Sequence, residues 1–159
     1  MATDEHYNDI RHSNMLFDGW RHAQSTITFA GGTANAIGDH DGTGDPFDIF
    51  TVTGDVLVKV FGVCTTNLAG ASATVEVGTS GDTAAIIAQT TATDVDSGEI
   101  WHDASPDSTV EASSVITENI VANGADIVGT VGTANITAGV IRFNCLWKPL
   151  SRDGKVTGV

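Results

Sequence analysis

Short segments of β-forming residues, separated at regular intervals by turn residues, make up the sequence after residue 24. Residues 25–30 (STITFA), for example, alternate polar and apolar side chains and stop at Gly31 and Gly32. A period of two places every second side chain on the same face of a strand, which is typical of a half-buried sheet. Helical periodicity does not extend over ten or more residues anywhere in this part of the sequence. The pattern therefore predicts an all-β fold.

The same alternation predicts nine or ten strands. Apolar residues in 47–63 indicate one long strand or two strands that bend at Gly54 and Asp55. A hairpin through 66–70 is the simplest connection to the next strand. Further strands are predicted at 71–78, 83–90, 98–101, 108–116, 119–122, 126–131 and 136–147. In the last of them we expect Ile141, Phe143, Cys145 and Trp147 to point inward.

A chain of 159 residues fits one domain with its own core. Many short strands at regular spacing predict a single-domain β-sandwich or barrel, and we favour jelly-roll topology. We assign residues 1–24 to an extended N-terminal arm, 25–150 to the β domain and 151–159 to a C-terminal tail.

The first 24 residues differ in character from the rest of the chain. They contain three of the five histidines and the only tyrosine, without a sustained period of 3.6 or two. A segment with so few large apolar groups cannot form its own core, so it lies on the main domain or on a neighbouring subunit, or else it is a frayed terminus. The arm residues that we predict to contact a capsid or another subunit are Tyr7, Ile10, Met15, Leu16, Phe17 and Trp20.

Acidic residues outnumber basic ones by 20 to 7, which gives a formal net charge of −13. Binding to nucleic acid is disfavoured because it depends on clustered Lys and Arg, and anionic membranes are disfavoured for the same reason. The acidity predicts a soluble, self-repelling surface or one that docks on a basic protein lattice. The sequence also lacks an apolar run of about 20 residues and the layout of a signal peptide, so we expect synthesis in the cytoplasm.

Cys64 and Cys145 each lie inside an apolar segment. Two buried free thiols are the main expectation, and a disulfide between facing strands is the alternative. Trp101 and Trp147 are expected to pack in the core or at an interface.

Two acidic loops are candidates for calcium binding, because calcium prefers six to eight oxygen ligands on a flexible loop. One loop contains Asp39, Asp41 and Asp45, and the other contains Asp94, Asp96 and Glu99. Turn chemistry explains Asp beside Gly equally well, so our main expectation is a chain without metal or cofactor.

Spacings typical of zinc sites, nucleophile elbows and phosphate-binding loops are missing from the sequence. His40 and His102 each neighbour an aspartate, and we interpret both as surface polar groups rather than catalytic dyads. We therefore expect a protein that is not an enzyme.

Several segments between Phe50 and Leu150 resemble small virion proteins of tailed bacteriophages. The similar segments are 51–60 (TVTGDVLVKV), 88–94 (AQTTATD), 98–101 (GEIW), 103–106 (DASP), 137–141 (TAGVI) and 145–150 (CLWKPL). The region from Phe50 to Leu150 that contains them is about two thirds of the chain, and the segments mark structural positions rather than a catalytic site.

The resemblance implies a capsid decoration (cement) protein of the phage head. Such a protein is commonly a trimer that sits on the outer surface of the major capsid protein lattice and reinforces it. The alternative, from a different class, is a tail-associated or carbohydrate-binding β module in which one of the acidic loops binds calcium.

Overall fold

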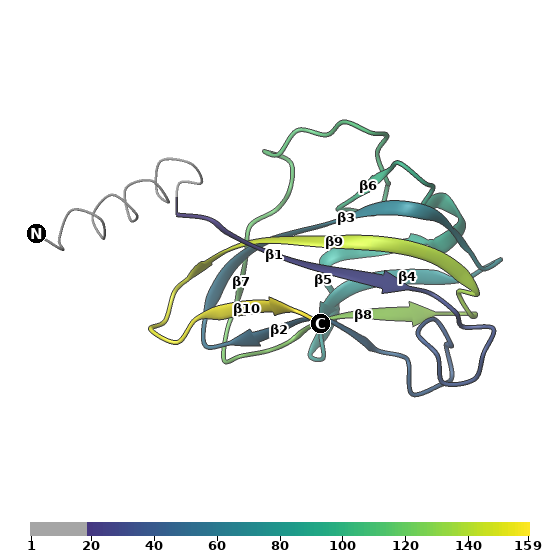
Figure 1. Ribbon diagram of the computed structural model, residues 1–159, viewed down its shortest axis with the longest axis horizontal. Coiled ribbons are helices and arrows are strands. Elements are labelled where there is room, and N and C mark those ends of the chain that lie inside the picture. Colours follow the sequence, from purple (N-terminus) through teal and green to yellow (C-terminus); the bar gives the residue numbers. More distant parts are fainter. Residues whose placement is uncertain (1–18) are drawn as a thin grey trace, which may run out of the picture.

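The computed structural model describes residues 19–159, and these residues fold into ten strands and one turn of 3-10 helix (Figure 1). The elements are β1 (Arg21–Thr28), β2 (Phe47–Thr53), β3 (Val56–Ala69), β4 (Thr74–Thr79), β5 (Asp82–Thr91), η1 (Ala92–Asp94), β6 (Ile100–Trp101), β7 (Asn119–Val121), β8 (Ile127–Gly132), β9 (Ala138–Pro149) and β10 (Lys155–Gly158). None of the helices in this described part is long and apolar enough to cross a membrane.

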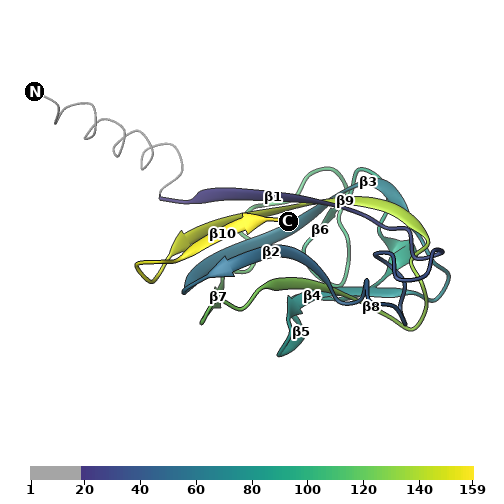
Figure 2. The same cartoon turned by 60° about the horizontal axis from the view of Figure 1, so that its bottom comes forward.

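The strands form two antiparallel sheets that pack face to face. Sheet A has the order β1-β9-β3-β6, with β7 also paired to β3, and sheet B has the order β10-β2-β8-β4-β5. Figure 2 shows β1, β9 and β3 as one layer above β4, β8 and β5. The predicted all-β sandwich is therefore confirmed. The jelly roll stays a prediction, with which this strand order is compatible.

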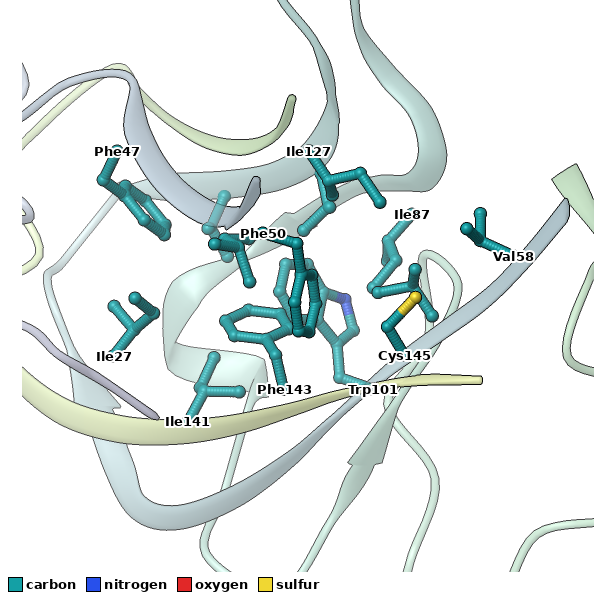
Figure 3. Packing of buried hydrophobic residues seen from close by; sticks show 14 of the residues in the cluster. Ile27, Phe47, Phe50, Val58, Ile87, Trp101, Ile127, Ile141, Phe143 and Cys145 are labelled. Atoms are coloured by element: carbon teal, nitrogen blue, oxygen red, sulfur yellow. The ribbon is translucent and has the colours of Figure 1, made fainter. Parts of the chain in front are cut away.

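The core lies between the two sheets and is built by alternate side chains of both. Phe50 of β2 points from sheet B toward Phe143 and Trp101 of sheet A (Figure 3), and all three side chains are fully buried. The indole Nε1 of Trp101 donates a 2.8 Å hydrogen bond to the Thr90 hydroxyl, so this buried polar atom is satisfied.

Alternation in β9 follows the prediction, since the four residues expected to point inward are all buried. They are Ile141, Phe143, Cys145 and Trp147. The predicted bend is also confirmed: β2 ends at Thr53, β3 begins at Val56, and Gly54 between them has a φ of 63°, which glycine adopts without strain.

Both cysteines are buried free thiols, as expected. Cys145 pairs with Val60 of β3, whereas Cys64 pairs with Ile141 of β9. The two cysteines are therefore four positions apart along neighbouring strands, about 13 Å at strand spacing. A disulfide requires Cα atoms closer than about 7 Å, so this register excludes the bridge.

Two local predictions are wrong. The hairpin through 66–70 does not form, because β3 pairs with β9 in sheet A and β4 pairs with β5 and β8 in sheet B. Residues 70–73 thus connect the two sheets. The strand predicted at 108–116 is a loop, because the chain turns away after Asp107 forms its bridge with Ile100.

The strands at both chain ends differ from the predicted boundaries. β1 begins at Arg21 rather than at Ser25, because Arg21–Gln24 continue the register with Trp147–Asn144 of β9. The predicted C-terminal tail contains β10, in which Val156 pairs with Val52 of β2 and is only 3% exposed. Four residues with one buried side chain give too weak a pattern to indicate a strand from sequence.

Candidate functional site

An apolar groove of about 370 Å³ lies on the outward face of sheet A. Outward faces of sandwich strands are usually polar, so an apolar lining marks this surface as a candidate contact site. Its apolar lining residues are Trp20, Phe61, Ile100, Ile116 and Leu146. We call this surface the outer groove.

Two neighbouring strands provide the outward side chains of the groove. Phe61 of β3 and Leu146 of β9 are half-buried, and each alternates with inward core residues along its strand. Lys59 of β3 pairs with Leu146 across the sheet, which places the lysine at the same groove. The groove thus combines an apolar lining with one cation, and Glu111 and Ser113 of the following loop also line it.

Trp20 lines the outer groove where the described chain enters β1. The Nζ of Lys148 lies 4.7 Å from the centroid of its indole ring, and the Nζ of Lys59 lies 5.7 Å away. Cation–π contacts of this length are attractive and hold the ring over β3 and β9. The residue at the root of the predicted arm therefore has a defined position.

The loop of residues 102–118, here called the covering loop, forms the other part of the groove. Figure 1 shows it rising above β3 between β6 and β7. Ile116 of this loop is only 8% exposed although it lies outside the interior core cluster, and the carboxylate of Glu118 lies 3.4 Å from the Nζ of Lys59. These contacts attach the end of the loop to sheet A.

Large apolar side chains are also exposed on the covering loop. Val110 is 84% exposed and Val115 is 49% exposed. Apolar groups in such positions gain free energy when a partner covers them, at about 25 cal/mol per Å² of buried apolar area. The groove and this loop therefore form a surface suited to binding protein side chains.

The covering loop also contains a cluster of ionisable side chains beside β6. The Nε2 of His102 lies 3.1 Å from the Oδ2 of Asp107 and 4.0 Å from the Oε2 of Glu111. We interpreted His102 as a surface polar group, but its side chain is only 6% exposed. The carboxylate of the neighbouring Asp103 accepts a hydrogen bond from the backbone N–H of Ser105. Separations of five and nine residues on an irregular loop carry no recognisable motif, so the sequence did not indicate this cluster.

The arm residues Tyr7, Ile10, Met15, Leu16 and Phe17 lie outside the described residues. Trp20 is the one predicted contact residue that the structure describes, and it lines the outer groove. The remaining lining residues were not predicted as a site, although Leu146 was expected on the outward face of its strand.

In the acidic loop of residues 39–45, the carboxylates have separate roles. Asp39 accepts a 2.7 Å hydrogen bond from the backbone N–H of Asn35, and Asp41 lies 3.7 Å from His40. Asp45 accepts a 2.9 Å hydrogen bond from the N–H of Val131, and burial raises the pKa of this carboxyl above its ordinary value. These contacts are those of turn caps and a loop anchor.

The loop of residues 94–99 is organised in the same way. The carboxylate of Glu99 accepts a 2.8 Å hydrogen bond from the backbone N–H of Asp96, and Ser97 is held by Asn67 and Thr65. Across residues 19–159, the histidine and carboxylate groups that approach one another as a set of three are His102, Asp107 and Glu111, and neither acidic loop forms such a set. Calcium binding at these loops stays an alternative to the main expectation of a chain without metal.

Comparison of the chain with protein-family models, curated protein sequences and solved structures finds no match.

Proposed function

We propose that this chain is a non-enzymatic virion protein of a tailed bacteriophage that binds the outer surface of the capsid lattice as an oligomer and stabilises the head. Its partner is the major capsid protein, and residues before β1 form the contact arm. The observation that carries the proposal is the outer groove, whose apolar lining includes Trp20 at the root of that arm. The resemblance of residues 50–150 to small phage virion proteins supports the same role.

Charge and architecture also support this role. A net charge of −13 repels packaged nucleic acid and favours docking on basic patches of a protein shell. A sandwich with a continuous core provides a rigid body, and repeated weak contacts on a lattice add up to strong attachment. Oligomerisation, with a trimer favoured, would cover the exposed apolar side chains of the covering loop.

The arm is tested by co-sedimentation with expanded empty capsids of the phage whose genome encodes the chain. Removing residues 1–18 deletes no residue of the described hydrophobic core, because the first core residue is Ala23 and the last is Val156. We expect the shortened protein to keep its circular dichroism spectrum and thermal midpoint while its binding to shells is lost.

A double variant tests the apolar character of the arm in the full-length protein. Leu16→Asp with Phe17→Asp introduces two negative charges and removes two apolar anchors, whereas the control Asn8→Asp with Ser13→Asp adds the same charge without removing an anchor. We expect the first variant to lose shell binding and the control to keep it. Wild-type binding by both the shortened protein and the Leu16/Phe17 variant would overturn the arm's role.

A further inference from the structure

We propose that His102, Asp107 and Glu111 form a binding site for one divalent transition-metal ion, with Zn²⁺ as the ion that fits best. The potential ligand atoms of the three side chains all lie within 4.8 Å of one another. Zinc binds imidazole nitrogen and carboxylate oxygen at about 2.0–2.2 Å, so two ligand atoms in a tetrahedral site are about 3.4 Å apart. The separations of 3.1 and 4.0 Å from His102 Nε2 to the two carboxylates bracket this distance.

The imidazole of His102 is the buried member of the cluster. Its side chain is only 6% exposed, and its Nε2 faces the carboxylates of Asp107 and Glu111, whose side chains are 38% and 22% exposed, respectively. His102 follows Trp101, whose fully buried ring anchors β6 in the core. A nearly buried nitrogen aimed at two partly exposed carboxylates leaves the solvent side for a water ligand, as in zinc sites with three protein ligands.

The backbone holds the ligands in place without a metal. Ile100 and Asp107 exchange two hydrogen bonds of 2.7 and 2.8 Å, which close the turn between them and fix Asp107 beside His102. Glu111 accepts a hydrogen bond from the N–H of Ala112 through Oε1, which leaves Oε2 directed toward His102. Preorganisation lowers the ordering cost of binding.

The ligand types favour a transition metal over calcium or magnesium. Imidazole nitrogen suits zinc and its neighbours in the first row, whereas calcium and magnesium prefer oxygen ligands alone. Two carboxylates and one neutral imidazole together carry two negative charges, which neutralise a divalent cation. The other explanation is a plain ion pair between protonated His102 and the carboxylates, which binds no metal.

A bound ion would connect three points of the covering loop, of which His102 directly follows β6. Residues 102–111 would then form a closed unit, and the loop that lines the outer groove would be stiffened. Because a metal that binds only the folded chain stabilises it by mass action, zinc at 100 times its dissociation constant should raise the thermal midpoint by about 5–10 °C.

The test is calorimetric titration of the full-length, metal-free protein with zinc chloride, together with thermal unfolding. We expect one ion per chain at this site, and Glu111→Gln and Asp107→Asn to weaken its binding by about a hundredfold or more. His102→Gln should abolish binding at this site and the rise in thermal midpoint. The matched control is Asp103→Asn, which changes a carboxylate of the same loop outside the cluster and keeps the oxygen that accepts from Ser105.

X-ray absorption on the zinc complex should show one imidazole and carboxylate oxygens at about 2.0–2.2 Å. Each variant is first checked by circular dichroism without metal. If His102→Gln does not fold, the zinc affinity of Glu111→Gln tests the site instead. This variant should fold, since the Glu111 side chain is partly exposed and glutamine has nearly the same size. The proposal is wrong if the wild type neither binds zinc nor gains stability from it, or if Glu111→Gln and Asp107→Asn bind as the wild type does, because the ion would then sit on other histidines.

Discussion

The thiol of Cys145 lies inside the sandwich with no exposed surface, and burial raises its pKa to about 12. Burial also raises the pKa of Cys64, a residue that is only 1% exposed. The thiolate is the reactive form, so at pH 8 only about one Cys145 in ten thousand is reactive even before access is considered. We predict that neither thiol of the native protein reacts with a disulfide reagent at pH 8, and that two per chain react in denaturant.

The same shift has a consequence at high pH. The unfolded thiol ionises near pH 9 and the folded one near pH 12, so the folded state holds the proton over this range. The protonated Cys145 thiol makes its full contribution to the free energy of unfolding below about pH 9. Between about pH 9 and pH 12 the free energy of unfolding falls by about 1.4 kcal/mol per pH unit. Cys145→Ala should remove this part of the slope in denaturant titrations. Rapid modification of the native protein, or an unchanged slope, would contradict the assignment.

Single residues were predictable where one face of a strand decided their position. Inward pointing of Ile141 and Phe143 follows from alternation, because a strand with one buried face fixes the side of each residue. The partner of His102 was not predictable, because the turn closed by Ile100 and Asp107 brings residues 102 and 107 together through backbone hydrogen bonds. The adjacent Asp103 instead accepts a hydrogen bond from the backbone N–H of Ser105.

At the scale of elements, β10 is the edge strand of sheet B and pairs with β2. Val156 is 3% exposed and pairs with Val52, while the neighbouring Thr157 is exposed. Val156→Ala removes two buried methyl groups and leaves a small cavity, so we expect a loss of about 2 kcal/mol in the free energy of unfolding. The measurement is the urea midpoint, with Thr157→Ala as the control that should unfold as the wild type does. Equal midpoints for the two variants would show that β10 is not part of the packed core.

Connections between elements were less predictable than the elements themselves. The bend at Gly54 was evident because glycine and aspartate interrupt an apolar run. The loop after β3 also contains turn residues, yet it leads into the other sheet, since β9 occupies the neighbouring position on β3. Turn residues in the sequence therefore predict where the chain turns. They do not predict which strands pair, because pairing depends on how the two sheets together bury the core.

For the whole molecule, the proposed role predicts an oligomer. A trimer of a 16.4 kDa chain has a mass of about 49 kDa, which light scattering after gel filtration distinguishes from a monomer. We expect the trimer mass to persist on dilution to low micromolar concentration. A mass of one chain at all concentrations would contradict the oligomer and would direct attention to the tail-associated, carbohydrate-binding alternative.

The sequence alone determined the fold class, most of the strands and the inward face of β9, because each follows from a local period of two and from turn residues. Tertiary structure alone decided which strands pair, the place of β10, the apolar lining on the outward face of sheet A and the approach of His102 to Asp107 and Glu111. These features join residues from separate segments. Their distances are set by packing of the two sheets around one core, and no local pattern in the chain contains that information.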